Sequence, residues 1–364
     1  MQLSELVGHN GDFGGLDISG LALDSRQVKP GYLFAALKGF RVDGRQFIPE
    51  AVERGAVAVL TGPETVEGLT DVVLVTDPNP RSRLARIAAR FFGQQPAHLA
   101  AVTGTNGKTS VAHFARQIWT LLGREAASIG TLGVEGTKVH ADRGLTTPDC
   151  LTFQRTLAEL AEMGTQRAVV EASSHGLSQY RLEGARFSVA AFTNLSRDHL
   201  DYHQTFEEYF AAKARLFAEL LPEDGTAVIN LEGAYGPEIE KICRARGLKT
   251  IGIALGHGEI KVGRLEAGTA GTSMSVTFEG TSYEIELPLV GGFQASNALV
   301  AAGIVVAAGE DPGAVFGALE WLKGVPGRLE AVGKTPAGGR VFVDYAHTPD
   351  GLENILQVAR TITP

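Results

Sequence analysis

The stretch that decides the fold is AVTGTNGKTS, residues 101–110. The apolar segment His98–Val102 predicts a strand, and apolar residues at helical spacing follow from Val111 to Leu122. A strand, a glycine-rich turn and a Lys-Thr pair opening a helix together make a phosphate-binding loop. Main-chain N–H groups and the helix N-terminus attract the anion, the lysine neutralises it, and a hydroxyl ligates Mg²⁺. The sequence therefore predicts a nucleotide site made by Gly104, Thr105, Asn106, Gly107, Lys108, Thr109 and Ser110.

Composition narrows the class of protein. The 364 residues suggest two to three domains, and a net charge of −8 argues against a surface for duplex nucleic acid. Cys150 and Cys243 are too few for a disulfide framework and fit a reducing compartment. The first ten residues lack the features of a signal peptide, and the longest apolar run, Ala298–Gly309, is too short to span a bilayer. We expect a cytoplasmic protein with no nucleic-acid partner and no membrane insertion.

The pattern of apolar segments predicts an α/β protein in three parts. Residues 1–97 alternate short apolar segments with turns and predict a small α/β domain. Residues 98–333 alternate strands with helices, which predicts a mainly parallel sheet covered on both faces. Within that part, residues 259–289 show period-two alternation, and we expect an antiparallel insert there. Residues 334–364 hold a predicted strand and the start of a helix, which we interpret as the beginning of an incomplete C-terminal domain.

Polar residues that follow predicted strands are candidates for the site, because ligands bind beyond the carboxyl ends of parallel strands. Glu171 ends one strand, where it is either a Mg²⁺ ligand or a capping or ion-paired acid; the sequence leaves both open. His199 and His203 are four apart, a spacing that suits zinc on a helix. Their surroundings are turn-like and no third ligand is evident, so we favour one histidine serving the nucleotide–metal site.

Lys213 is placed unusually for a lysine. It lies on the apolar stripe of the predicted helix 205–221, where it either extends to water or is desolvated. Desolvation favours the neutral amine, which can act as a nucleophile or take up CO₂. Arg328 and Asp344 are weaker candidates, for contacts to phosphate and to ribose hydroxyls respectively.

Together these motifs resemble the Mur ligases, the ATP-dependent amide-forming enzymes of peptidoglycan precursor synthesis. The loop, with Val102 where a standard P-loop has glycine, looks like the ATP loop of that family. The segment 292–297 resembles its adenine-side motif, with Asn297 at the adenine position, and Arg328 and Asp344 match its later ATP contacts. The motifs TTP (146–148), EASSHGL (171–177) and DYAHTP (344–349) look like the members that add the third residue of the peptide.

The resemblance implies further site residues and cofactors. ATP and Mg²⁺ are the implied cofactors. Lys213 falls at the position of a carbamylated lysine, and the implied metal ligands are this lysine, Thr109, Glu171 and His199. The implied catalytic residues are Lys108, Glu171, His199 and Lys213. The implied contacts to the uridine diphosphate end are Leu23, Ser25, Phe40, Arg41 and Val42, and those to the muramoyl-dipeptide are Thr146, Thr147, Ser173, Gln179 and Arg181.

The implied reaction adds an amino acid, meso-diaminopimelate with L-lysine left open, to a UDP-muramoyl-dipeptide through an acyl phosphate. We expect a monomer. Gln294 and the segment 231–233 depart from the family pattern, and the family's Asp-Asn-Pro-Arg motif for diaminopimelate does not occur before Pro364. The C-terminal Rossmann-like domain is therefore expected to be truncated. Two alternatives remain: the Mur ligase that adds D-alanyl-D-alanine, and a truncated, non-catalytic nucleotide-binding protein.

Overall fold

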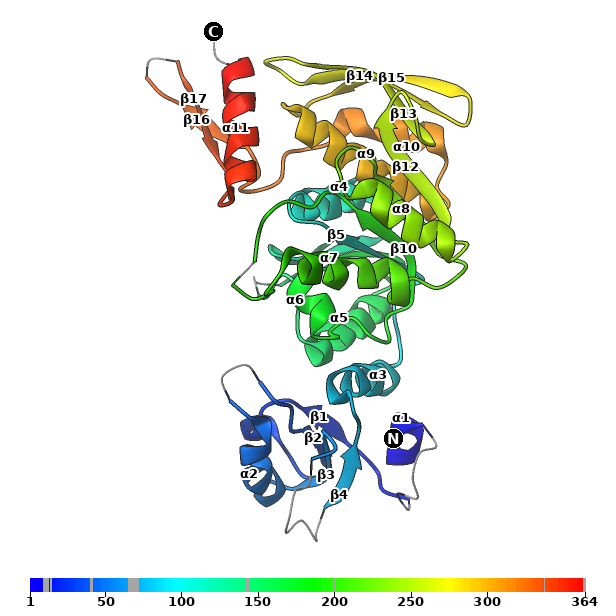
Figure 1. The fold of residues 1–364 in the computed structure, drawn as a ribbon, viewed down its shortest axis with the longest axis vertical. Coiled ribbons are helices and arrows are strands. Elements are labelled where there is room, and N and C mark those ends of the chain that lie inside the picture. Colours follow the sequence, from blue (N-terminus) through cyan, green and yellow to red (C-terminus); the bar gives the residue numbers. More distant parts are fainter. Residues whose placement is uncertain are drawn as a thin grey trace. The chain divides into compact units, whose positions relative to one another are not determined.

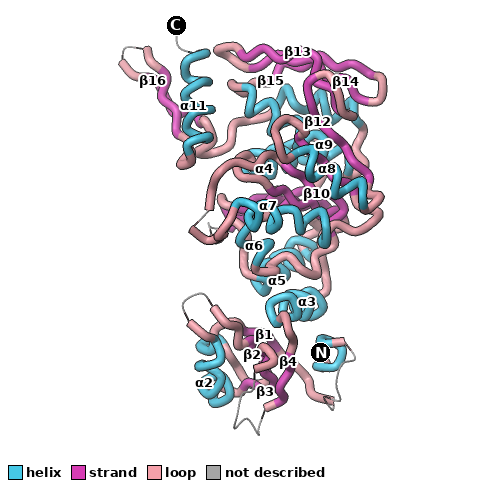
Figure 2. Tube along the Cα trace, in the orientation of Figure 1, coloured by secondary structure: helices cyan, strands magenta, loops and turns pink. Residues whose placement is uncertain are grey.

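A computed structural model describes residues 1–8, 13, 15–39, 42–64, 72–141, 144–199, 201–336 and 338–362 (Figures 1 and 2). Contacts within the chain divide it into two compact units, which are described separately. The first unit consists of Met1–Gln95, Pro148–Glu162 and Ser178–Ala185, and the second of Pro96–Thr147, Met163–Leu177 and Arg186–Pro364.

The first unit is built on a four-stranded parallel sheet in the order β1-β2-β3-β4. Side chains alternate between its faces, so Leu33 and Ala35 pack with α1 and α3, while Phe34 packs with α2 on the other face. Helix α5 packs against α3. The elements are α1 (Leu3–Val7), β1 (Gly20–Ala22), η1 (Ser25–Gln27), β2 (Tyr32–Ala35), η2 (Gly44–Phe47), α2 (Ile48–Glu53), β3 (Ala56–Thr61), β4 (Val73–Thr76), α3 (Pro80–Phe92) and α5 (Cys150–Glu162).

The second unit is built on a sheet of eleven strands in the order β15-β14-β13-β12-β11-β10-β5-β9-β6-β7-β8. Its strands are β5 (His98–Thr103), β6 (Ala126–Gly130), β7 (Gly133–Gly136), β8 (His140–Ala141), β9 (Arg167–Glu171), β10 (Phe187–Phe192), β11 (Thr226–Asn230), β12 (Lys249–Leu255), β13 (Ile260–Ala267), β14 (Thr272–Phe278) and β15 (Thr281–Leu287). Its helices are α4 (Lys108–Leu121), α7 (Phe206–Arg215), the π-helical turn η3 (Leu216–Leu220), α8 (Gly236–Ala245), α9 (Gly292–Ala307), α10 (Pro312–Ala318) and η4 (Leu319–Trp321); the short helix α6 (Ser174–Ser178) ends where the units divide.

The core of the second unit explains why its central strands are continuously apolar. Helices α4 and α9 pack together on one face, where Phe114 and Trp119 are fully buried against strand residues such as Val102. Helix α8 packs against β11 and β12, and η3 packs against β10. The six strands β12, β11, β10, β5, β9 and β6 are parallel neighbours with side chains buried in their central parts, which confirms the predicted doubly covered sheet.

The antiparallel strands predicted at 259–289 are present as β13, β14 and β15. They continue the large sheet through β12 rather than forming a separate layer. Beyond them the chain forms the antiparallel pair β16 (Glu330–Lys334) and β17 (Arg340–Val343), followed by α11 (Pro349–Ile362). Of the helices in the described ranges, none is long and apolar enough to cross a membrane.

Candidate functional site

The predicted phosphate loop lies between β5 and α4, at the carboxyl edge of the sheet. The chain after β10 holds it in place: Asn194 accepts from the Asn106 N–H through its side chain (3.0 Å) and from the Thr105 N–H through its carbonyl (2.9 Å). Gly107 has φ +89°, and a Cβ there would lie 2.3 Å from Oδ1 of Asn297. Glycine is required at this position, and the first N–H groups of α4 remain directed at the loop.

Two lysines converge on the carbonyl of Gly104. Nζ of Lys108 donates to Gly104 O (2.9 Å) and Thr105 O (2.8 Å), and Nζ of Lys213 donates to Gly104 O (2.7 Å). Lys213 is 1% exposed, and its Nζ lies 4.5 Å from the ring centroid of Tyr209. Burial, followed by the charge of Lys108, holds the pKa of Lys213 well below its usual value. Burial also lowers the pKa of Lys108. The apolar stripe left open whether Lys213 extends to water or is desolvated, and the structure shows it desolvated, which favours the neutral amine.

Glu171, at the end of β9, is held as an acceptor by three hydrogen bonds. Its Oε2 accepts from the hydroxyls of Thr109 (2.9 Å) and Thr131 (3.1 Å), and its Oε1 accepts from the Thr131 N–H (2.9 Å). The side chain is 1% exposed. Among the residues that the structure describes, Glu171 has neither a helix-capping contact nor an ion pair. It is a buried carboxylate that contacts the first turn of α4.

His199 lies on the loop after β10, not on a helix. Its φ is +52°, and its Nε2 lies 3.4 Å from Oδ2 of Asp198. Burial lowers its pKa, so the ring favours the neutral form that can ligate a metal. His175 lies against it with a ring-centroid distance of 4.9 Å. Within the described ranges, no group of three His, Cys, Asp or Glu side chains is arranged for a metal ion.

Two cavities meet at the loop. One of about 160 Å³ is lined by predicted catalytic and metal residues, Lys108, Thr109, Glu171, His199 and Lys213, and also by Thr105, Thr131, Thr146, Ser173 and Arg328. The other, of about 370 Å³, is lined by residues that include Asn106, Gly107, Ser110, Asn297, Arg328 and Asp344. The residues that line both cavities are Asn106, Gly107, Arg328, Tyr345 and His347. A triphosphate laid along the loop would therefore have its nucleoside in the larger cavity and its terminal phosphate in the smaller.

Arg328 and Asp344 are held by contacts across this region. Nη2 of Arg328 donates to the Thr109 hydroxyl (2.9 Å). The carboxylate of Asp344 accepts from the N–H groups of Leu329 and Ala346, both at 2.6 Å. Thr147 donates to the carbonyl of Glu171 (2.6 Å) and lies 2.9 Å from the Ser173 hydroxyl. The predicted nucleotide residues and this part of the predicted peptide contacts are thus brought together in the second unit.

The remaining predicted contacts belong to the first unit. Ser25 donates to Glu50 (2.7 Å), Arg181 donates to Gln179 (2.7 Å), Leu23 is half-buried and Val42 is exposed. Phe40 and Arg41 lie outside the described residues.

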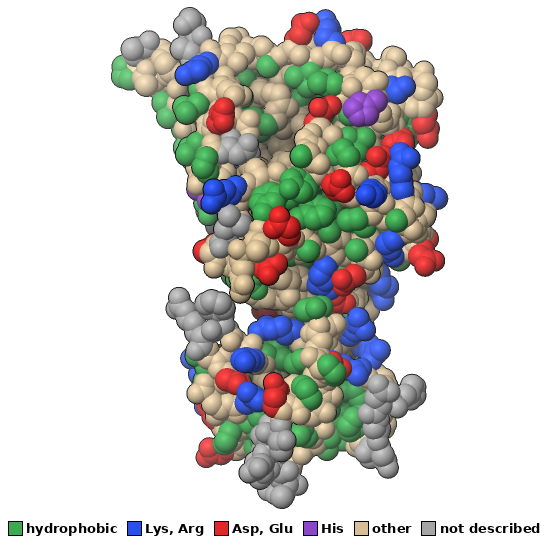
Figure 3. All heavy atoms as spheres, in the orientation of Figure 1, with side chains coloured by type: hydrophobic (Ala, Val, Ile, Leu, Met, Phe, Trp, Pro, Cys, Tyr) green, Lys and Arg blue, Asp and Glu red, His purple; other side chains and the backbone are tan. Residues whose placement is uncertain are grey.

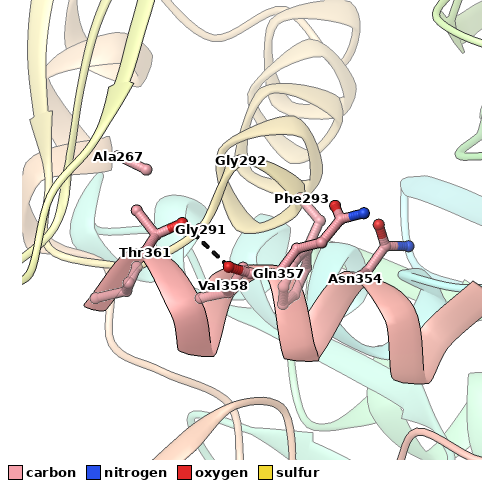
Figure 4. Close-up of a pocket in the computed structure, with 9 residues that line it drawn as sticks. Ala267, Gly291, Gly292, Phe293, Asn354, Gln357, Val358 and Thr361 are labelled. Atoms are coloured by element: carbon pink, nitrogen blue, oxygen red, sulfur yellow. Dashed lines mark hydrogen bonds between the residues drawn. The ribbon is translucent and has the colours of Figure 1, made fainter. Parts of the chain in front are cut away.

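A third hollow, of about 220 Å³, lies between the start of α9 and α11 (Figure 4). Its lining includes the amides of Asn354 and Gln357 and the ring of Phe293. The residues that line it carry no carboxylate, lysine or histidine, so it lacks groups for acid–base or phosphate chemistry. On the face shown in Figure 3, basic and acidic side chains are interspersed.

Sequence reasoning missed Thr131 and the anchoring role of Asn194. Both follow central parallel strands, β6 and β10, so their position at the carboxyl edge was an available signal. The sequence did not indicate that the Thr131 hydroxyl hydrogen-bonds to Glu171, because the two residues are 40 positions apart.

Comparisons with known proteins show which family and relatives the chain resembles. The family model described as "Mur ligase middle domain" matches residues 102–305, and "Mur ligase family, catalytic domain" matches residues 17–92. A UDP-N-acetylmuramoyl-L-alanyl-D-glutamate--2,6-diaminopimelate ligase of Bradyrhizobium diazoefficiens is 48% identical, over 99% of this chain and 75% of its own. A solved structure of a ligase with that name matches with TM-score 0.86 and 31% identity, over 100% of this chain and 75% of its own. A MurF ligase from Thermotoga maritima in complex with ADP shares the fold, with TM-score 0.64 and 20% identity, over 95% of this chain and 75% of its own.

Proposed function

This chain belongs to the Mur ligase family, and we propose that it carries the nucleotide and UDP-sugar sites for joining diaminopimelate to UDP-N-acetylmuramoyl-L-alanyl-D-glutamate. The observation that carries this proposal is 48% identity over 99% of the chain, together with a loop, a buried carboxylate and a buried lysine around one cavity. The chain spans about three-quarters of that relative. For this reason we propose substrate binding and activation for this chain and no site for the incoming amine.

The proposed chemistry follows from the charges that must be overcome. The D-glutamyl γ-carboxylate of the substrate attacks the γ-phosphorus of ATP, ADP leaves, and an acyl phosphate forms. The amine of the incoming amino acid then displaces phosphate, and an amide results. A carboxylate and a triphosphate repel each other, so Lys108 and Arg328, both at the cavity, would neutralise charge on the transferred group.

The residues present fit a magnesium ion. Mg²⁺ prefers oxygen ligands, and the Thr109 hydroxyl and Glu171 supply them. A carboxylate has about four lone-pair positions, and three of those on Glu171 are already used by hydrogen bonds, which leaves room for one ligand bond. A carbamate on Lys213 would add two oxygens, and His199 a nitrogen. Bound Mg²⁺ would neutralise phosphate charge and align the γ-phosphate for in-line transfer.

We further propose roles for the remaining residues. Asn297 and Asp344 would contact adenine and ribose, and Asn106, Gly107 and Ser110 the phosphates. The division of the chain at 97 and 333 is proposed from the pattern of apolar segments, and the roles of the parts, a UDP-sugar domain, an ATP domain and the start of a third, from the resemblance. The predicted sugar and peptide contacts are Leu23, Ser25, Phe40, Arg41, Val42, Thr146, Thr147, Ser173, Gln179 and Arg181.

The experiment that tests the proposal is a calorimetric titration of the chain with a non-hydrolysable ATP analogue, with and without Mg²⁺. We expect binding that Mg²⁺ strengthens and that Asn297→Ala weakens. Absence of nucleotide binding by a folded chain would refute the proposal. Glu279→Gln, on the turn between β14 and β15, serves as a control that removes a charge far from the loop in the sequence.

A further inference from the structure

A row of hydroxyl groups connects the predicted peptide contacts to the predicted phosphate contacts through Glu171. The Thr146 hydroxyl lies 3.0 Å from that of Thr131, which donates to Oε2 of Glu171 (3.1 Å). The same carboxylate oxygen accepts from the Thr109 hydroxyl (2.9 Å), which in turn accepts from Arg328 (2.9 Å). Thr131 is the only member of this chain of contacts to which the proposed function assigns no role.

The direction of the hydrogen bonds follows from counting protons. A hydroxyl has one proton and two lone pairs, and a buried carboxylate only accepts. Thr131 must therefore give its proton to Glu171, and in its contact with Thr146 it accepts. Thr109 likewise donates its only hydroxyl proton to Glu171. Its oxygen can therefore only accept, as it does from Arg328. This polarity leaves Thr109 as an acceptor, which is what a metal ligand must be.

Thr131 holds the carboxylate of Glu171 through two hydrogen bonds. The Thr131 N–H binds Oε1 and the hydroxyl binds Oε2, so together they fix the plane of the carboxylate. Gly130, immediately before, leaves the space for this contact, since a Cβ there would lie 2.0 Å from Oε1. The charge of Glu171 acts on Lys108 through space, but the hydrogen bonds that its carboxylate accepts come from Thr109 and Thr131. Thr109 and Thr131 are thus the groups that orient the charge.

We infer that Thr131 is a positioning residue, which aims Glu171 at Thr109 and thereby sets the affinity of the site for the magnesium–nucleotide complex. Partners of this kind, one shell removed from a metal, typically change metal affinity 10- to 100-fold. The inference rests on the proposed function, because it assumes that Glu171 and Thr109 face the metal. It predicts a measurable role for a residue that need not touch metal or nucleotide.

The test uses the chain as it is, with three variants. Thr131→Val keeps the shape and the N–H contact but removes the hydroxyl, and Thr131→Ser restores a hydroxyl. The matched control is Thr272→Val: Thr272 is also a threonine with a bonded hydroxyl, 1% exposed, and its partner is the carbonyl of Leu289 in the antiparallel part of the sheet. The affinity for AMP-PNP is measured by calorimetry in saturating Mg²⁺ and in EDTA, and the ratio of the two is the magnesium enhancement. Thermal unfolding is followed for each variant.

We expect Thr131→Val to lower the magnesium enhancement about 10-fold, with the affinity in EDTA little changed. Thr131→Ser should recover most of the loss, and Thr272→Val should keep the wild-type enhancement even if its melting temperature falls. A purely structural role would move melting temperatures and leave the enhancement alone. An unchanged enhancement in a folded Thr131→Val, or an equal loss in Thr272→Val, overturns the inference. A wild-type chain without any magnesium enhancement would instead count against the proposed metal site itself.

Discussion

Gly130→Ala introduces one methyl group beside the buried carboxylate of Glu171. The new Cβ would lie 2.0 Å from Oε1, whereas real Cβ contacts are essentially never shorter than 3.0 Å. The carboxylate must therefore retreat by about 1 Å, which is enough to break the 2.9 Å bond from the Thr131 N–H. Hydrogen bonds to a charged group contribute roughly 1.5–3 kcal/mol each. We expect the free energy of unfolding to fall by about 3 kcal/mol and the magnesium-dependent nucleotide affinity by at least about 10-fold.

The assay is urea unfolding followed by circular dichroism, with nucleotide affinity measured separately on the folded variant. The matched control is Gly317→Ala in α10, where an added Cβ meets no atom within 4 Å. Because alanine favours a helix over glycine by roughly 0.5–1 kcal/mol, that variant should be slightly more stable than the wild type. If Gly130→Ala unfolds within about 1 kcal/mol of the wild type and binds nucleotide equally well, the described fit around Glu171 is wrong.

Three other perturbations test separate parts of the account. Lys108→Ala should abolish ATP binding in calorimetry, and unchanged affinity would refute the loop assignment. Lys213→Ala should lose magnesium-dependent nucleotide binding and regain part of it in acetate or formate, because a small carboxylate can replace a carbamate; no rescue in a folded variant counts against carbamylation. Burial lowers the pKa of His113 to about 4. Its neutral form is favoured in the fold, so stability is full above its unfolded pKa of about 6.5 and falls as the pH drops from there towards 4, by about 3 kcal/mol in total. His113→Asn should flatten that slope in urea melts taken between pH 7 and 4, and an equally steep slope would contradict the assignment.

The parts of the fold that the sequence predicted are those that local patterns encode. The strand before the loop, helix α4 and the strands of the central sheet follow from runs and spacings of apolar residues, and the structure confirms them. The apolar stripe placed Lys213 on the buried side of its helix but left open whether its amine reaches water, and its 1% exposure decides for burial.

What the sequence could not predict depends on partners far apart in the chain. Lys108 and Lys213 both donate to the carbonyl of Gly104. Lys213 is 109 positions from Gly104, so no local pattern encodes this contact. The two hydrogen bonds from Thr131 to Glu171 require β6 to lie next to β9, and the order of strands in a sheet cannot be predicted from the periodicity of apolar residues. Segments 148–162 and 178–185 group with the first unit despite their place in the sequence, because contacts between distant segments, such as those of α5 with α3, decide the grouping.

The most direct test of the central claim is which UDP-muramoyl peptide the chain binds. Calorimetric titrations with the L-alanyl-D-glutamate dipeptide form and with the tripeptide form, each in the presence of Mg²⁺ and AMP-PNP, compare the substrate of the proposed step with its product. The account predicts clear binding of the dipeptide form and weaker or no binding of the tripeptide form. Tight binding of the tripeptide form with none of the dipeptide form would contradict it and point to the ligase that adds D-alanyl-D-alanine.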